Sequence, residues 1–253
     1  MAKNGKYLYC VIKEKDPKKF GILGQGGNEV YAINEGDLAI AVSDSPKEEY
    51  SFIKDHLTCH QKVIEEVMGQ GYDVLPVRFG TVAKSREHIK EKILKSKRKE
   101  LLETFPIVEG RIELGLRAFW KDMPSIFQEI VAEDKEIQIA KKQVQGNPVQ
   151  LNIARVGEMV EKALEVKREN EAQKILDPLK KLAVDFKPRE LLKSREIMKD
   201  SMICSSAFLV AKEKEKEFDQ RIRALIKEHD KRIKFIYIGP IPPFNFVELH
   251  LTV

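Results

Sequence analysis

The sequence lacks any long apolar run. Its longest stretch, Met202 to Ala211, is interrupted by Ser205 and Ser206, whereas a membrane-spanning helix needs roughly 20 apolar residues. The early stretch Tyr7 to Ile12 is shorter than the apolar part of a secretory signal, and no small-residue cleavage site follows it. We therefore expect a cytoplasmic protein that does not cross a membrane.

Cysteine and catalytic motifs are also scarce. The three cysteines, Cys10, Cys59 and Cys204, form no CxxC pair, so we expect free structural thiols and no disulfide. There is no GxSxG motif, and Cys59 falls in the middle of an expected helix, where a thiol is not activated. Because the carboxylates lie among lysines and arginines in charged helical stretches, no general acid or base stands out. These absences argue against an enzyme and against a cofactor.

What the chain does contain is enough apolar sequence to fold and a high density of charge. It has 253 residues, of which 42% are apolar and 34% charged, and this length favours two domains. The net charge of +5 is local: residues 84–99 hold eight Lys or Arg against two Glu, so the rest of the chain sums to −1. The basic excess is therefore a patch and not a field over the whole protein.

The first 120 residues predict an α+β sheet domain. Residues 7–12 read as a central strand, residues 29–33 and 38–43 as a hairpin around Gly36, and residues 46–71 as a helix with an apolar stripe that includes Ile53. Residues 16–28 read as a loop, and Pro76 indicates an edge strand or a bulge. Residues 111–120 alternate, which predicts a strand with one buried and one mostly wet face.

The remainder predicts a helical connector and a smaller α+β domain. After the basic helix expected at residues 85–103 of the first domain, residues 122–142 and 151–182 read as helices on either side of Gly146-Asn147-Pro148. Strands are expected at 201–211 and 232–238, a helix at 213–229, and a last strand with Val247, Leu249, Leu251 and Val253 on one face. The predicted division is 1–120, 121–190 and 191–253.

Two short patterns suggest a bound ligand, and each also has a simpler interpretation. His56 and His60 are four residues apart on one helix face, as a metal pair requires, but zinc needs four ligands and no second pair exists. The run Gly24-Gln25-Gly26-Gly27 lacks the GK[ST] ending and the following helix of a phosphate-binding loop. Packing of a helix face and an ordinary loop are the interpretations that we prefer.

Two further segments suggest macromolecular partners. Residues 84–99 contain Lys95, Lys97, Arg98 and Lys99, which could contact nucleic-acid phosphates or an acidic protein. No aromatic residue is interleaved for base stacking, and a solvated helix face is the interpretation that we prefer. Residues 236–247 hold three prolines within four residues, next to Phe244 and Phe246. The two phenylalanines either fold back on the core or form a docking surface.

Four stretches in this order resemble the gas vesicle protein F/L family (GvpF/GvpL), and the resemblance spans nearly the whole chain. They are YLYCVI, HLTCHQKVIEEVMGQG leading into DVLPVRFGTV, RIELGLRAFW, and FIYIGPIPPFNFVELHL. Residues 75–80 resemble the family's LPxRFG run. Residues 239–246 resemble its GPxPPYxF turn, with Phe244 in place of the usual tyrosine.

The resemblance implies a non-catalytic accessory protein of gas vesicle assembly, associated with the vesicle, that serves cellular buoyancy. Its implied partners are the small hydrophobic shell protein, bound during nucleation or early assembly, and other accessory proteins. The implied fold has a modified ferredoxin-like first domain. We predict partner contacts at Pro76, Arg78, Phe79, Phe244 and Phe246, with Arg78 pairing with a shell carboxylate across a sheet edge or apolar groove.

Two rival hypotheses come from other classes of protein. A ferredoxin-like domain with the His56/His60 pair and the glycine loop would be a metal- or nucleotide-binding regulator, and a bound ligand would raise its melting temperature. A nucleic-acid binder would lose affinity steeply with salt and on neutralising the basic patch.

Overall fold

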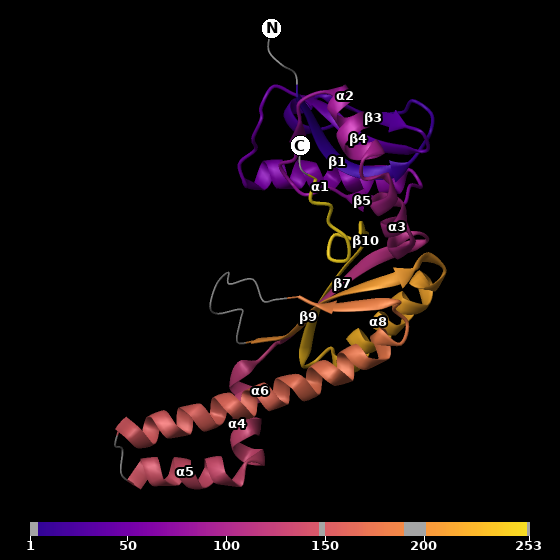
Figure 1. Ribbon diagram of the computed structural model, residues 1–253. Coiled ribbons are helices and arrows are strands. Elements are labelled where there is room, and N and C mark those ends of the chain that lie inside the picture. The colour runs from indigo at the N-terminus through magenta and orange to yellow at the C-terminus, as the bar shows by residue number, and fades with distance from the viewer. Residues whose placement is uncertain (1–4, 147–149, 190–200, 252–253) are drawn as a thin grey trace. The chain divides into compact units, whose positions relative to one another are not determined.

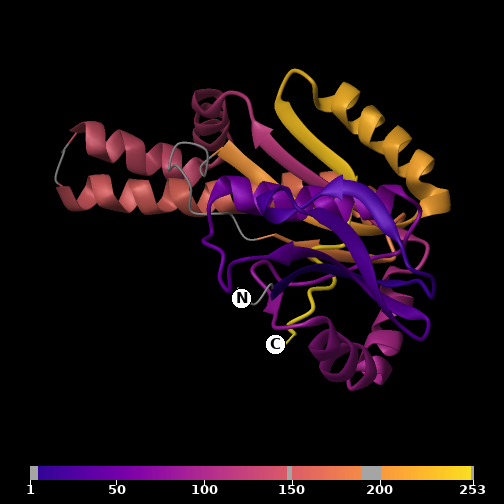
Figure 2. The ribbon, with the colours of Figure 1, turned by 90° about the horizontal axis from the view of Figure 1, so that it is seen from above.

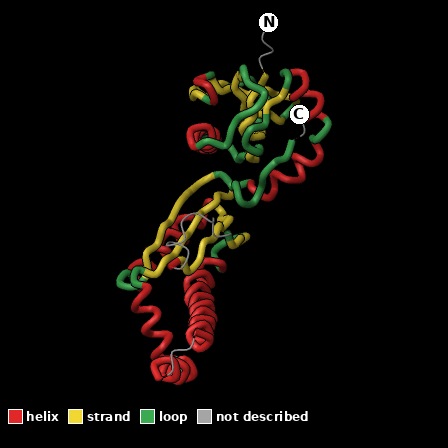
Figure 3. The backbone as a smooth tube through the Cα atoms, turned by 90° about the vertical axis from the view of Figure 1, so that its left-hand side faces the viewer, coloured by secondary structure: helices red, strands yellow, loops and turns green. Residues whose placement is uncertain are grey.

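The computed structural model describes residues 5–146, 150–189 and 201–251. The chain divides into two units: the first contains Met1–Glu113 together with Gly239–Val253, and the second contains Leu114–Ile238. Figure 1 labels the elements, and Figure 3 distinguishes the strands and helices of both units by colour. Each unit has its own antiparallel sheet and its own helices.

The first unit is built on a sheet in the order β2-β3-β4-β1-β5, with β6 also paired to β1. The predicted central strand and hairpin are confirmed: β1 pairs with β4, and β4 pairs with β3 through the turn at Gly36, which has φ +64°. Strand β2 lies within the predicted loop and was missed. The strands are β1 (Gly5–Lys13), β2 (Lys19–Leu23), β3 (Glu29–Glu35), β4 (Leu38–Ser45), β5 (Leu75–Pro76) and β6 (Val82–Ala83).

Helices cover both faces of this sheet. Helix α1 (Lys54–Gly69) packs on the face that carries Tyr7 and Tyr9, and the helical segments α2 (Arg86–His88), η2 (Ile89–Lys95) and α3 (Arg98–Val108) cover the face that carries Leu8 and Val11. A register shift in β1 between Leu8 and Cys10 changes which residues face each core. The expected single basic helix at 85–103 is therefore three segments, with η2 π-helical.

The C-terminal segment belongs to the first unit, which corrects the expected last strand of a second domain. Val247, Leu249 and Leu251 are buried in the same core cluster as Leu8 and Val11, while Val253 lies outside the described residues. Leu249 forms a parallel bridge with Val77 and is not part of the second sheet. The alternating apolar residues of this C-terminal segment pack beside a sheet edge that is distant in the sequence. Sequence patterning cannot distinguish such a segment from a strand of a nearby sheet.

The second unit contains a sheet with the strand order β10-β7-β9-β8, and its four described helices are α4, α5, α6 and α8. Helices α5 and α6 lie side by side in Figures 1 and 2, and α6 also packs against β9 and α8. The predicted break at Asn147-Pro148 lies outside the described residues. The elements are β7 (Arg111–Trp120), α4 (Met123–Glu133), α5 (Lys135–Gly146), α6 (Gln150–Lys180), β8 (Asp185–Pro188), β9 (Met202–Ala211), η3 (Lys212–Lys214), α8 (Glu215–His229) and β10 (Ile233–Ile241).

Strand β7 is buried on both faces, so the expectation of one wet face is wrong. Glu113 has no exposed surface, and Gly115 and Phe119 on the same face are also buried. The alternation of charged and apolar residues suggested solvent because a buried carboxylate normally requires dedicated partners. Glu113 has such partners, described below.

Helix α6 confirms the long predicted helix and explains why its apolar stripe lapses at residues 167–171. Lys167 pairs with Glu129 and Glu133 of α4 at 3.1 and 2.8 Å, and Glu171 accepts from Trp120 Nε1 at 2.5 Å. Farther along, Ile175 and Leu179 return to the core. Polar contacts therefore replace apolar ones along one side of the same helix, which packs within the second unit.

The fold is α+β with two antiparallel sheets, as predicted. The ferredoxin-like detail is not confirmed by the strand orders found here. The predicted division at 120 and 190 differs from the two units of the structure, because the C-terminal segment returns to the first unit, and residues 190–200 lie outside the described parts. Among the described residues, no helix has both the length and the apolar character needed to cross a bilayer.

Candidate protein-docking surface

The segment from Leu75 to Gly80 presents one charged side chain from an otherwise anchored strand. Leu75, Pro76 and Val77 are buried, Arg78 is exposed, and Phe79 is half-buried. Strand β5 pairs with β1 at the end of the sheet, which confirms the edge position predicted from Pro76. This arrangement directs Arg78 to solvent from a fixed backbone.

The backbone of this segment is already paired on both sides. Val77 N donates to Tyr9 O at 2.9 Å on the β1 side. On the outer side, Arg78 N donates to Leu249 O at 3.0 Å, and Leu249 N donates to Pro76 O at 2.8 Å. The C-terminal segment thus occupies the edge at Pro76–Arg78, so a partner strand cannot be added there, and any partner must contact side chains.

A buried histidine fixes the turn that follows. Val77 O can only accept, so His60 Nε2 carries the proton that bonds it at 3.1 Å, and Nδ1 accepts from the Tyr7 hydroxyl at 3.1 Å. The Tyr7 oxygen in turn accepts from Gly80 N at 3.1 Å. Burial lowers the pKa of His60 to about 4, and burial raises the pKa of Tyr7, so both groups stay neutral near pH 7.

A groove of about 520 Å³ opens beside Arg78. Its lining residues are Glu48, Arg78, Phe79, Gly80, Thr81, Val82, His250 and Leu251. We call it the Arg78 groove. Its aromatic residue, Phe79, is packed 5.6 Å from the His60 ring and 5.0 Å from the Phe52 ring, measured between centroids. Phe79 therefore joins the buried tyrosine–histidine cluster to the surface.

An apolar patch adjoins this groove. Phe52 is 73% exposed and Ile53 is 50% exposed, immediately before helix α1 begins at Lys54. Ile53 was predicted on the buried stripe of that helix, but it occupies the N-cap position, where the chain is extended. We call Phe52, Ile53 and Phe79 the aromatic shelf. Because two large apolar side chains are exposed next to each other, we take this patch as a candidate contact surface.

The charges of the groove are sparse. The guanidinium of Arg78 makes no ion pair within the part of the chain that the structure describes, whereas His250 Nε2 lies 3.0 Å from Glu248. An unpaired arginine beside exposed aromatic rings suits a partner segment that carries both a carboxylate and apolar side chains.

Comparison with known proteins identifies the family. The family model described as "Gas vesicle synthesis protein GvpL/GvpF" matches residues 5–248. The chain belongs to the GvpL/GvpF family. Gas vesicle protein F of Nostoc sp. is 27% identical and that of Microcystis aeruginosa 26%, with 97% of this chain covered in each case and 99% and 98% of the relatives. Gas vesicle protein L1 of Halobacterium salinarum is 22% identical, covering 96% of this chain and 90% of its own length.

Solved structures of the same family share the fold. The crystal structure of GvpF from Anabaena sp. matches with a TM-score of 0.86 at 25% identity and covers 98% of this chain and 99% of its own. GvpF from Microcystis aeruginosa matches with a TM-score of 0.80 at 25% identity, covering 97% and 99%.

The proline-rich turn of this GvpL/GvpF chain is anchored in the first unit. Glu113 Oε2 accepts from Asn245 N at 2.8 Å, and Glu113 Oε1 accepts from the Asn245 side-chain amide. Phe244 packs against the core cluster that contains Tyr7 and Tyr9, which favours the interpretation in which this aromatic residue folds back. Phe246 is also half-buried. Their predicted partner contacts stay predictions, made by rings that are already partly covered.

The patterns that suggested a ligand have structural uses. Both ring nitrogens of His60 are engaged, so this residue cannot also bind a metal, and His56 contacts Ser51 O and the Tyr50 ring instead. In the glycine loop, Gln25 N donates to the Tyr9 hydroxyl at 2.7 Å. Gly24 N and Gly27 N bond Asn28 O and Gly24 O within the loop, so these donors are not presented to a phosphate.

The basic segment is largely paired with neighbouring carboxylates. Lys90 and Lys95 lie 3.7 and 3.5 Å from Glu35, and Arg98 lies 2.6 Å from Asp37, at the turn between β3 and β4. Hydrogen bonding from Arg98 lowers the pKa of Asp37. These ion pairs are exposed and individually weak. They nevertheless place much of the basic charge next to carboxylates of the β3–β4 hairpin, which favours a solvated helix face over a nucleic-acid-binding surface.

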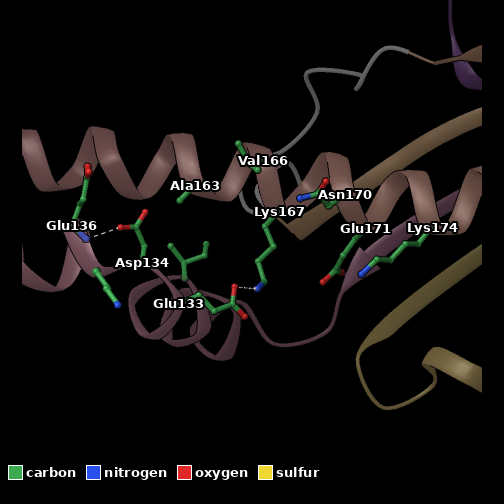
Figure 4. Close-up of a pocket in the computed structure, with 11 residues that line it drawn as sticks. Glu133, Asp134, Glu136, Ala163, Val166, Lys167, Asn170, Glu171 and Lys174 are labelled. Atoms are coloured by element: carbon green, nitrogen blue, oxygen red, sulfur yellow. Dashed lines mark hydrogen bonds and ion pairs between the residues drawn. The ribbon is translucent and has the colours of Figure 1, made fainter.

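A second hollow of about 710 Å³ lies in the second unit beside α4 and α6 (Figure 4). One of its lysines, Lys167, pairs with the lining carboxylate of Glu133, and Figure 4 shows the lysine reaching toward it. Burial alone would lower the pKa of Lys167, but hydrogen bonds to Glu133 and Glu129 outweigh it and raise the pKa. Arg232 bonds Glu129 and Glu171 at 2.5 and 2.6 Å, so this network joins α4, α6 and the start of β10.

Sequence reasoning missed the aromatic shelf and Glu113. The signal for the shelf was the pair Phe52-Ile53, which falls between a proline-containing loop and the helix and lies outside its strict periodicity. The signal for Glu113 was an acidic residue between Ile112 and Leu114, which was interpreted as a wet face. Only the three-dimensional neighbour Asn245 distinguishes a buried carboxylate from an exposed one.

Proposed function

We propose that this GvpL/GvpF chain is a non-catalytic accessory protein that binds the small hydrophobic gas vesicle shell protein during nucleation or early assembly. Other accessory proteins of the vesicle are its further partners, and it acts in the cytoplasm and at the vesicle. The proposed docking site is the Arg78 groove together with the aromatic shelf. A shell protein with an apolar surface would aggregate unless a partner covered that surface before assembly.

The observation that carries this proposal is that Arg78, which makes no ion pair with any described residue, lies on a rigid support beside the exposed Phe52 ring and the half-buried Phe79 ring. His60 and Tyr7 fix the backbone at Val77 and Gly80, so Arg78 and Phe79 are held in place before a partner arrives. A preorganised site loses less conformational entropy on binding than a mobile one. Phe52 and Ile53 supply the apolar contact, and Arg78 supplies an ion pair that fixes the orientation of the partner.

The test is capture of the gas vesicle shell protein by the full-length tagged chain on co-expression. Arg78→Glu and Phe52→Ser should each reduce the captured amount at least tenfold. Matched controls are Arg155→Glu, an exposed arginine of α6, and Leu23→Ser, a residue of the first unit that is 68% exposed; both should capture as the wild type does. Thermal melts should show that the four variants remain folded, since surface substitutions usually change stability by about 0.5 kcal/mol or less.

The outcomes separate the function from the site. Failure of the wild-type chain to capture the shell protein would refute the proposed function. If Arg78→Glu and Phe52→Ser behave as their controls do while the wild type captures the shell protein, the function stands and the docking surface is wrong.

A further inference from the structure

Exposed sheet edges pair readily with other chains, and among the four edges formed by the described strands three are protected. Strand β2 has five residues, a positive φ of +72° at Gly21 and a register shift against β3. Strand β8 has four residues, among them Asp185, Lys187 and Pro188. The edge at β5 is covered by Leu249, as described above.

Strand β10 differs from the other edges in length and composition. It has nine residues, and Lys234 is its one charged side chain. It ends the second sheet and pairs with β7 alone within the described parts of the chain. Residues 233–238, which belong to the second unit, contain no proline and no acidic residue that would protect the outer side. Its outward backbone groups therefore form a template for a further strand.

The side chains of β10 leave apolar surface open beside this edge. On one face, Tyr237 donates to Asp219 of α8 at 2.5 Å, and the Phe235 ring lies 6.4 Å from His229. On the other face, Ile238 is 39% exposed and lies over Gly115 of β7, where a side chain is absent. A neighbouring strand with aliphatic side chains would cover Ile238 and extend that face.

We propose that the outer edge of β10, over residues 233–238, takes up an extended apolar segment of a different protein by strand addition, with a carboxylate of that segment meeting Lys234. The unpaired backbone requires an extended chain, because only a strand presents donors and acceptors at matching spacing. A second copy of this chain fits less well, because β10 contains Lys234 and no acidic residue, so pairing two copies would leave both amines unmatched.

The binding partner used in the test is the gas vesicle shell protein. This choice of partner rests on the proposed function, whereas the exposed edge of β10 does not depend on it. The full-length chain is co-expressed with it as wild type, Ile238→Lys, Lys234→Glu and Ile226→Lys. Ile226 is the matched control, because it is an isoleucine of the same unit, on α8, and is 37% exposed. Circular dichroism of each variant verifies folding. Hydrogen exchange of the wild-type chain is measured with and without the shell protein.

We expect Ile238→Lys and Lys234→Glu to reduce capture at least tenfold and Ile226→Lys to change it less than twofold. Amides within residues 233–238 should exchange at least tenfold more slowly in the complex, which a contact made by side chains alone would not produce. Equal capture by all variants, or unchanged exchange in β10 while the wild type binds, would overturn the strand-addition proposal and leave the proposed function intact. If the wild type captures nothing, both proposals fail. A dimer of the free chain that Ile238→Lys converts to monomer would instead assign the edge to a second copy.

Discussion

At the scale of single residues, His60 shows how a residue that resembles a metal ligand serves instead as a support. One imidazole nitrogen donates to Val77 O and the other accepts from Tyr7, whose oxygen accepts from Gly80 N. The histidine therefore holds one end of the segment that presents Arg78 directly and the other end through Tyr7. Because the charged form of His60 would be buried, this support depends on pH.

The pH dependence of stability should identify His60. Its pKa is about 4 in the folded chain against an ordinary histidine pKa of 6.5, so the unfolded chain binds more protons between these pH values and the stability contribution is lost as pH falls from 6.5 toward 4. Linkage gives a loss of about 2 kcal/mol between pH 7 and pH 5. In His60→Gln this loss should be absent from the urea unfolding of the first unit, followed by tyrosine near-ultraviolet circular dichroism. An equal pH dependence in the variant would contradict a buried neutral histidine.

Two glycines should respond oppositely to alanine. Gly80 has φ +83°, which an L-residue rarely adopts, although among the described atoms an added methyl group would approach only Tyr50 O, at 3.9 Å. Gly80→Ala should therefore cost about 1–2 kcal/mol from backbone strain alone. Gly157, inside α6 with open space around it, should gain up to about 1 kcal/mol as alanine. Thermal melts of both variants test this, and a neutral Gly80→Ala would show that the turn relaxes.

At the scale of elements, local patterns predicted what depends on local sequence. The central strand β1, the β3–β4 hairpin, α6 and the edge position of Pro76 follow from apolar runs, turn glycine, helical periodicity and proline. Strand β2 was missed because Gly21 interrupts its pattern, and the wet face of β7 was wrong because Glu113 is satisfied by a residue 132 positions away. The candidate site divides in the same way: the edge position next to Arg78 was predictable from Pro76, but the nearness of the aromatic shelf depends on tertiary contacts.

The carboxylate of Glu113 should prove essential to the proline-rich turn. Glu113→Ala removes the acceptor for the part-buried Asn245 N and for the Asn245 side-chain amide, so the first unit should lose about 2–4 kcal/mol. Glu109→Ala, which breaks an exposed ion pair with Lys13, should cost about 1 kcal/mol or less. Urea unfolding measures both losses, and hydrogen exchange should accelerate at residues 244–247 in Glu113→Ala alone. Equal losses in the two variants would show that Glu113 does not anchor the turn.

At the scale of the whole molecule, the chain leaves the first unit after Glu113 and returns to it at Gly239. The first unit is therefore discontinuous in sequence, with the entire second unit inserted between its parts. Strands β7 and β10 carry the chain out and back. A fragment that ends near Trp120 lacks the returning segment, so it cannot reproduce the Arg78 groove, which is lined in part by His250 and Leu251.

Truncation after Phe246 should therefore unfold the first unit and spare the second. It removes Val247, Leu249 and Leu251 from the core, each contributing about 1.5–3 kcal/mol, and exposes the backbone of Pro76 and Arg78. That sum approaches the full stability of a small domain, about 5–15 kcal/mol. The tyrosine circular dichroism of the first unit should be lost, while the fluorescence of Trp120, the single tryptophan, should keep its urea midpoint. Leu249→Ala should give an intermediate loss of about 2–4 kcal/mol. A truncated chain with an unchanged tyrosine signal would mean that the C-terminal segment only rests on a first unit that is complete without it.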